Sequence, residues 1–197
     1  MYLVDTHTHI FLKEFDDDLV EVVGRAKEAG LKKLYLPNVD SSSIERLHRL
    51  CDRYPDFCSP MMGLHPTSVD ADCRKELDLI FSQFEQRNYI AVGEIGIDLY
   101  WDKTYLKEQK IVFEEQLKWS IEKNLPVAIH TREAFPEVFD SIYKVGADKL
   151  RGVFHSFGGS EEELEEIKKL DNFFIGINGV VTYKKVLFPE YLSIMPI

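Results

Sequence analysis

The first feature with chemical potential is a His-x-His pair, His7 and His9, within the first ten residues. Apolar residues flank the pair and predict a short buried strand over residues 3–10 that becomes polar toward its end. Because side chains two positions apart in a strand point to the same face, the two imidazoles should lie side by side. Neutral imidazole nitrogens are common metal ligands, so the pair is a candidate site for one metal ion. The alternative is two structural histidines that alternate by chance, and polar residues later in the chain argue against it.

Four further polar side chains come late in predicted strands. They are His65 at the end of the run 58–65, Glu94 in the run 90–97, His130 at the end of the run 127–130 and His155 in the run 153–157. The carboxyl ends of parallel strands converge on one face of a barrel, where active sites are built. Five of the six histidines therefore fall where chemistry is expected, whereas His48 lies within a helical pattern and is interpreted as a surface or packing residue.

The candidate ligands are imidazoles and one carboxylate. Such ligands suit Zn, Mn, Fe or Co, and Mg if water and carboxylate dominate. Four histidines and a carboxylate exceed a single tetrahedral site, which favours two divalent metal ions (Mg, Mn or Zn) bridged by Glu94. Two ions a few ångströms apart can clamp a phosphoryl group and lower the pKa of a bound water. A purely structural Glu94 is the alternative, but a buried carboxylate needs partners.

Three side chains near these positions are candidates for contacts with a substrate. Trp101 lies in the loop after the fourth strand, where an exposed ring can stack on a base, although covering the barrel would explain it equally well. Arg132, two residues after His130, can grip a phosphate through its planar guanidinium, and a surface ion pair is the alternative. His65 precedes Pro66, which fixes the following backbone, and we interpret it as a substrate contact rather than a ligand.

The elements that must position these residues alternate along the chain. Strand-like runs occupy residues 3–10, 33–39, 58–65, 90–97, 127–130, 153–157 and 173–180. Helical patterns lie between them, over 18–28, 76–86 and 108–123, and capping-box pairs at Ser42 with Glu45 and at Ser160 with Glu163 open two more helices. Alternating strands and helices predict an α/β fold with a parallel sheet. The absence of a linker or low-complexity tract favours a single domain over residues 1–197.

Composition narrows the class of protein. The 24 Lys and Arg against 34 Asp and Glu give a net charge of -10. This charge argues against sequence-independent binding of long nucleic acid through a broad basic surface, but it does not exclude a nuclease that holds phosphate locally through metal. No run of residues predicts a membrane span or a signal peptide, and we predict no obligate protein partner. Three cysteines without a C-x-x-C pair favour reduced thiols and a cytoplasmic location.

These motifs, in this order, resemble the TatD family of metal-dependent hydrolases, within the amidohydrolase superfamily. The resemblance is carried by Asp5-Thr6-His7-Thr8-His9, Gly63-Leu64-His65-Pro66, Gly93-Glu94-Ile95-Gly96-Ile97-Asp98, Ile129-His130-Thr131-Arg132 and Phe154-His155-Ser156-Phe157-Gly158-Gly159-Ser160, and it extends to residues 176–184. It implies a TIM-type (β/α)8 barrel and hydrolysis of phosphodiester bonds, with DNA or short single-stranded oligonucleotide ends as substrate. By this resemblance His7 and His9 bind the first metal, Glu94 bridges and is catalytic, and His130 and His155 bind the second.

The chain departs from the family pattern at its end. Family members continue into an eighth strand ending in Glu-Thr-Asp, whose aspartate binds metal, whereas we count seven strands and Glu190 is the single carboxylate after Val180. We therefore expect a C-terminally incomplete barrel and weak nuclease activity. Two alternatives stay open: another amidohydrolase-type or phosphoesterase hydrolase on the same scaffold, and a catalytically impaired homologue that binds without turnover.

Overall fold

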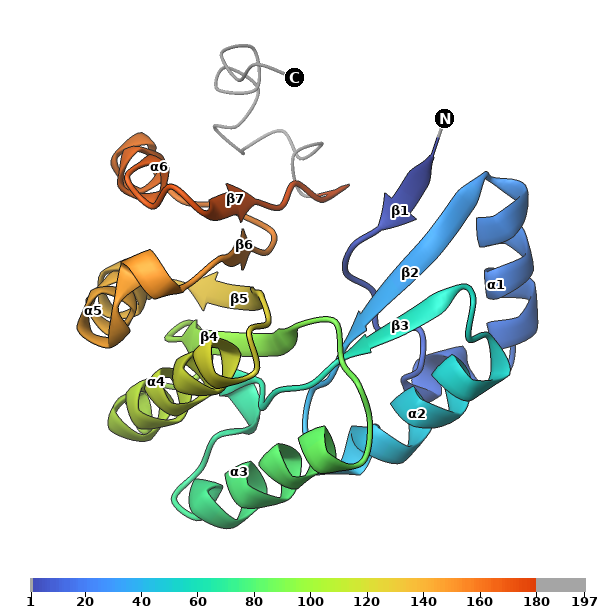
Figure 1. Cartoon of the computed structure of the whole chain (residues 1–197), viewed down its shortest axis with the longest axis horizontal. Helices are drawn as coiled ribbons and strands as arrows, with labels where there is room; N and C mark the ends of the chain where they lie inside the picture. The colour runs from blue at the N-terminus through green and yellow to red at the C-terminus, as the bar shows by residue number, and fades with distance from the viewer. Residues whose placement is uncertain (1, 180–197) are drawn as a thin grey trace.

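Strands and helices alternate along residues 2–179, the part of the chain that the structure, a computed structural model, describes (Figure 1). The strands are β1 (Leu3–Asp5), β2 (Leu31–Pro37), β3 (Cys58–Met61), β4 (Val92–Asp98), β5 (Val127–Arg132), β6 (Gly152–Phe154) and β7 (Phe173–Ile175). The α-helices are α1 (Leu19–Glu28), α2 (Ile44–Arg53), α3 (Cys73–Ser82), α4 (Leu106–Glu122), α5 (Phe135–Val145) and α6 (Glu161–Lys168). This alternation confirms the predicted α/β class.

All neighbouring strands pair in parallel, in the orders β1-β2-β3 and β4-β5-β6-β7. A parallel bridge between Met62 and Val92 joins the two groups, and Gly93 N donates to Met62 O at 3.0 Å. The strands therefore follow one another around a curved sheet with the helices outside it, and β1 and β7 lie at its two edges (Figure 1). Among the described residues this is a partial barrel, as the seven predicted strands imply.

The core fills the space between the sheet and the outer helices. Strand β4 is buried at all seven positions, which is typical of a parallel strand covered on both faces. The largest fully buried side chains include Phe113 of α4 and Phe154 of β6. Full burial of such a side chain contributes about 1.5–3 kcal/mol each. The three cysteines are unpaired, and Cys51 and Cys58 are buried.

Helix ends follow the predictions only in part. The predicted box at Ser160 is confirmed, because Ser160 Oγ accepts from Glu163 N at 3.3 Å and Glu163 Oε2 accepts from Ser160 N at 2.6 Å. The predicted box at Ser42 and Glu45 is wrong. Asp40 caps a short 3-10 turn there and accepts from Ser43 N at 3.2 Å, two residues earlier than predicted.

Helix α5, over Phe135–Val145, is absent from the helices predicted from the sequence.

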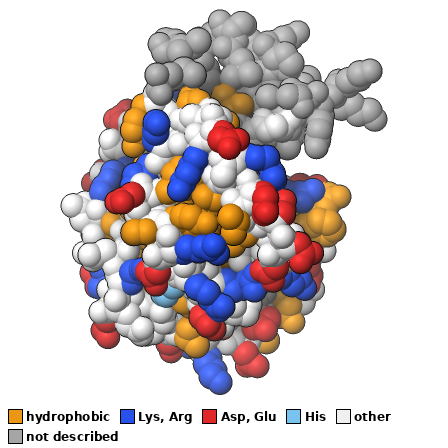
Figure 2. Space-filling view, turned by 90° about the vertical axis from the view of Figure 1, so that its right-hand side faces the viewer, with side chains coloured by type: hydrophobic (Ala, Val, Ile, Leu, Met, Phe, Trp, Pro, Cys, Tyr) orange, Lys and Arg blue, Asp and Glu red, His pale blue; other side chains and the backbone are white. Residues whose placement is uncertain are grey.

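One face of the molecule and one large cavity lie away from the candidate histidines. Figure 2 views the right-hand side of Figure 1, the side occupied by α1 and α2, and shows Lys and Arg side chains interspersed with Asp and Glu around a hydrophobic group. A mainly apolar cavity of about 750 Å³ opens near the amino ends of β4 to β7 and includes Met61, Val153 and Phe174 in its lining. Over residues 2–179, no helix combines the length and apolarity needed to cross a membrane. The predicted end of the seventh strand at Val180, the segment 180–184 and Glu190 lie outside the described residues.

Two glutamines on one face of α4 form hydrogen bonds with the backbone of the sheet and of the segment after β3. Gln116 is fully buried; its Oε1 accepts from Leu64 N at 2.7 Å and its Nε2 donates to Leu64 O at 3.2 Å. Gln109, two turns earlier, makes the same pair of contacts with Asp98, at 2.8 and 3.1 Å. Residues seven apart lie on the same helix face, so one helix fixes the backbone beside His65 and at the end of β4.

Replacement of Gln116 by leucine keeps the side-chain volume similar but removes both hydrogen bonds to Leu64. The buried amide and carbonyl of Leu64 lose their partners, so we expect the free energy of unfolding to fall by about 1–3 kcal/mol. Urea denaturation measures this loss. Gln86→Leu, at an exposed position, is the matched control and should change stability by less than about 0.5 kcal/mol. A Gln116→Leu protein as stable as the control would show that these bonds contribute nothing net.

Candidate metal centre

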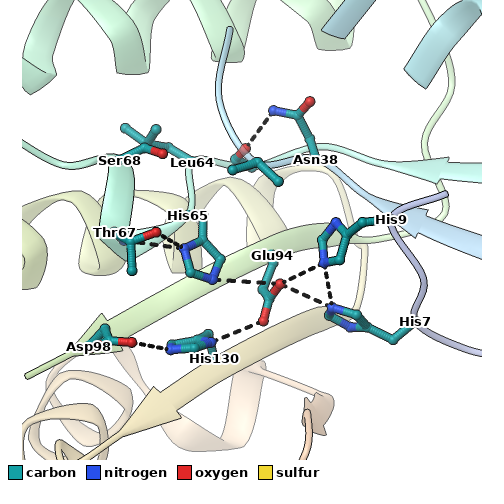
Figure 3. A network of polar contacts seen from close by, with 12 residues as sticks. His7, His9, Asn38, Leu64, His65, Thr67, Ser68, Glu94, Asp98 and His130 are labelled. Carbon is teal, nitrogen blue, oxygen red and sulfur yellow. Dashed lines mark hydrogen bonds and ion pairs between the residues drawn. The ribbon is translucent and has the colours of Figure 1, made fainter. Parts of the chain in front are cut away.

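The histidine pair lies just beyond β1 rather than within a strand. The predicted strand 3–10 is shorter, because β1 ends at Asp5, and Asp5 Oδ1 accepts from His7 N at 3.1 Å. Thr8 N still donates to Tyr35 O of β2 at 3.1 Å, so the segment keeps running beside β2. The two histidines consequently point the same way, and their Nε2 atoms are 3.2 Å apart (Figure 3).

His7, His9 and Glu94 form a tight group of ligand-type atoms. Glu94 Oε2 lies 3.0 Å from His7 Nε2 and 3.3 Å from His9 Nε2. Ligands about 2.0–2.2 Å from a shared ion are themselves about 3 Å apart, which is the spacing seen here. His9 Nδ1 is buried without a hydrogen-bond partner among the described residues. Donor chemistry and spacing therefore fit a divalent metal ion at this position.

A second group surrounds the other oxygen of the same carboxylate. His130 Nδ1 lies 3.2 Å from Glu94 Oε1, and His130 Nε2 lies 2.8 Å from Asp98 Oδ2 (Figure 3). The ligand-type atoms of His65, Glu94 and His130 also lie close enough together to hold an ion. His155 belongs to neither group: its ring stacks on that of His7, with 3.3 Å between centroids. Its role as a ligand stays a prediction.

His65 presents a defined tautomer to this site. Its Nδ1 accepts from Thr67 N at 3.2 Å, and Thr67 Oγ1 is 2.7 Å away. A backbone N–H can only donate, so Nδ1 is the acceptor nitrogen and the neutral ring carries its proton on Nε2. That Nε2 faces Glu94 Oε2 at 3.7 Å. In this tautomer His65 offers the site a hydrogen-bond donor rather than a lone pair.

Burial and charge act against each other at the centre. Glu94 is only 3 % exposed, and burial alone would raise its pKa, but hydrogen bonds to His130, His7 and His9 hold the pKa well below the usual range. Burial also lowers the pKa of His130, yet its bonds to Glu94 and Asp98 outweigh this and raise the pKa. Burial lowers the pKa of His65 and of His155 to about 4. Both are therefore neutral near pH 7.

Sequence reasoning missed Asn38 and Gln109, and it placed Asp98 in a motif without predicting its contact with His130. Asn38 is fully buried and directly follows β2. Its side-chain Nδ2 donates to Gly63 O at 2.9 Å, and its backbone carbonyl accepts from Glu94 N at 3.2 Å. Asp98 holds His130, and Gln109 holds Asp98. Polar residues at positions that should be apolar were the available signal, above all the glutamines seven apart in α4.

The two predicted substrate contacts outside the histidines lie together. The guanidinium of Arg132 stacks on the ring of Tyr100, 3.6 Å from its centroid, and lies 5.3 Å from the centroid of Trp101. Trp101 is 70 % exposed. Arg132 pairs with Asp98 in the β4–β5 register, so this cluster begins at the strand end that carries the centre. Both side chains are exposed, and their contact with a substrate stays a prediction.

Comparison with known proteins gives the family. The model of the TatD related DNase family matches residues 4–192. YabD of Bacillus subtilis, described as an uncharacterized metal-dependent hydrolase, is 34% identical over 188 residues, which span 95% of this chain and 73% of YabD. TatD of Dickeya dadantii, named a 3'-5' ssDNA/RNA exonuclease, is 31% identical over 180 residues, 91% of this chain and 67% of that protein.

A solved structure agrees with both findings. The crystal structure of YjjV, a TatD homologue from Escherichia coli K12, superposes with a TM-score of 0.89 at 28% sequence identity, over 98% of this chain and 75% of YjjV. Identity at this level together with so close a superposition confirms the predicted TatD-type fold. With a family match over nearly its whole length, the chain belongs to the TatD related DNase family of metal-dependent hydrolases.

Proposed function

We propose that this chain hydrolyses phosphodiester bonds at the ends of single-stranded DNA. The observation that carries the proposal is the buried Glu94 carboxylate, which has His7 and His9 within 3.3 Å of one oxygen and His130 at 3.2 Å from the other. A bridging carboxylate between two groups of donors suits a two-ion centre for phosphoryl chemistry. The exonuclease name of the TatD relative from Dickeya dadantii supports nucleic acid as the substrate.

In this proposal His7, His9 and Glu94 hold one divalent ion, and Glu94, His130 and His155 hold the other. Divalent ions such as Mg, Mn or Zn would polarise a phosphoryl oxygen and lower the pKa of an attacking water. Asp98 acts as a positioning residue, because its Oδ2 lies 2.8 Å from Nε2 of His130, the ring nitrogen that does not face Glu94. Carboxylates in this arrangement fix the orientation of a ligating imidazole.

Substrate binding is assigned to three other side chains. His65 donates from Nε2 to an oxygen of the scissile phosphate, in keeping with the proton placement that Thr67 imposes. Arg132 binds a neighbouring phosphate, since its guanidinium is the charged group stacked beside the centre. Trp101 provides an exposed ring for a base. The acidic net charge makes these local contacts the main source of attraction for an anionic strand.

Activity should depend on divalent metal and on Glu94. The purified chain, tested with a 5'-labelled single-stranded oligonucleotide and added Mg or Mn, should shorten it at a low rate, in line with the weak activity expected from the sequence, and a chelator should stop the reaction. Glu94→Gln keeps the shape but removes the charge that both groups share, so turnover should fall by about 10²-fold or more. Asp56→Asn, at an exposed turn, is the matched control. Equal turnover by Glu94→Gln and wild type would reject the proposed centre.

Asp98 should affect metal affinity through His130. Asp98→Asn leaves the backbone contacts of Gln109 possible but weakens the hold on the imidazole, so divalent-metal affinity should drop by about 10–100-fold. Calorimetric titration with Mn measures the effect. Glu28→Gln at the exposed end of α1 should leave affinity unchanged. If Asp98→Asn binds Mn as tightly as wild type, Asp98 does not position a ligand.

His65 should separate metal binding from turnover. If it is a donor and not a ligand, His65→Ala should retain the bound metal of wild type, measured by elemental analysis, while oligonucleotide turnover falls by about 10²–10⁴-fold. His48→Ala, which removes an imidazole that contacts Tyr89 instead, controls for the loss of a histidine. Loss of one metal equivalent in His65→Ala would make His65 a ligand.

A further inference from the structure

A second, smaller pocket adjoins the metal centre. It measures about 340 Å³ and lies between the 3-10 turn Pro66–Ser68 and the segment that leads from β4 into α4. Asp70, Asp98, Trp101, Asp102 and Tyr105 are among its lining residues. Ligand pockets typically hold about 300–1,000 Å³, so the pocket is large enough for one planar group of a substrate.

Both walls of the pocket are attached to site histidines. On one side, Thr67 contacts Nδ1 of His65 through its amide and its hydroxyl. On the other side, Asp98 Oδ2 contacts His130 while its Oδ1 accepts from Tyr100 N at 2.9 Å and from Trp101 N at 3.3 Å. A group bound in the pocket is therefore next to the phosphate that the centre would hold.

The lining combines aromatic rings with acceptors of hydrogen bonds. Trp101 and Tyr105 contribute aromatic side chains, while Asp70 and Asp102 contribute carboxylates. Each carboxylate is fixed by an amide of its own loop, Asp70 by Asp72 N and Asp102 by Thr104 N, both at 2.8 Å. A carboxylate has about four lone-pair sites, so acceptor capacity remains for a ligand. Hydrogen bonds from Thr104 lower the pKa of Asp102, which keeps this side chain ionised at neutral pH.

The charge of the lining decides what the pocket can take. No Lys or Arg is among its lining residues; the guanidinium of Arg132 stacks on Tyr100 and lies 5.3 Å from the Trp101 ring without lining the pocket. A phosphate would meet carboxylates and is disfavoured. A planar group that stacks and donates N–H bonds is favoured, and nucleobases with an exocyclic amino group have this chemistry. Thymine has a single ring N–H between two carbonyls, which face the carboxylates unfavourably.

We propose that this pocket binds the nucleobase next to the scissile phosphate and selects bases that carry an exocyclic amino group, cytosine and adenine among them, over thymine. The inference rests on the proposed nuclease function for the type of ligand. Asp102 is the specificity-determining residue, because it is the ionised acceptor beside the exposed ring of Trp101. Base selection of this kind divides the substrate between an acidic pocket for the base and the metal centre with Arg132 for the phosphates.

Nucleoside binding tests the pocket without requiring hydrolysis. Deoxycytidine, deoxyadenosine and thymidine are titrated separately, and binding is followed by tryptophan fluorescence, since Trp101 is exposed and the second tryptophan, Trp119, is buried. The amino-bearing nucleosides should bind about tenfold more tightly than thymidine, as expected for a hydrogen bond to a charged acceptor. Asp102→Asn should remove this preference, because its amide can donate to a thymine carbonyl. Asp56→Asn is the control and should keep it.

The outcomes separate the pocket from the nuclease function. Equal binding of the three nucleosides, no binding, or an unchanged preference in Asp102→Asn overturns the pocket, even if oligonucleotides are hydrolysed. Preferential binding in a protein that never hydrolyses oligonucleotides supports the pocket and rejects the nuclease function. Trp101→Phe should lose most of the fluorescence change, and a response that persists unchanged in this variant places binding elsewhere and overturns the proposal.

Discussion

The buried carboxylate of Glu94 is the constraint on which the rest of the structure depends. A charged group that is 3 % exposed loses its water and must be compensated by the protein or by bound ions. The compensation comes from chain segments far apart in sequence: His7 and His9 after β1, and His130 on β5 (Figure 3). The curved parallel sheet brings these strand ends around one side chain, and the outer helices cover its convex side (Figure 1).

Helix α4 supplies much of that support. A helix that packs against a sheet normally buries an apolar stripe, and α4 does so with Phe113 and Leu117. On the same buried surface it carries Gln109 and Gln116, whose amides satisfy backbone groups at the ends of β4 and beside His65. Buried amides are stable only when both ends are paired, and here each pairs with an N–H and a C=O of one residue. The helix thus fixes the position of the backbone at Leu64 and Asp98 relative to the centre.

The sequence was sufficient for the alternation of strands and helices, the parallel α/β class and the convergence of His7, His9, Glu94 and His130, because hydrophobic runs and strand-end polar residues are local patterns. It was not sufficient for the partners of those residues. The bonds of Asp98 to His130 and of Gln116 to Leu64 link positions 32 and 52 residues apart. Helix α5 was missed because a short amphipathic segment with Pro136 in its first turn follows directly on the strand end. The strand over residues 3–10 was too long in prediction, although Thr8 keeps the alternation by pairing with Tyr35 beyond the end of β1.

In the proposed function an acidic protein acts on an anionic chain, and the distribution of its charge is compatible with this. A net charge of -10 gives no general attraction for nucleic acid, and the face in Figure 2 mixes both signs. Attraction for the nucleic acid would then arise at the site of the reaction, from bound divalent ions and from Arg132. Arg132 is the last residue of β5, and its guanidinium stacks on Tyr100. Contacts confined to one or two phosphates favour chain ends and short single strands over long duplexes, because little affinity accumulates along the backbone. In the proposed function, the carboxylates of Asp70 and Asp102 in the adjoining pocket would disfavour a phosphate there, so that phosphates are directed to the metal centre and Arg132.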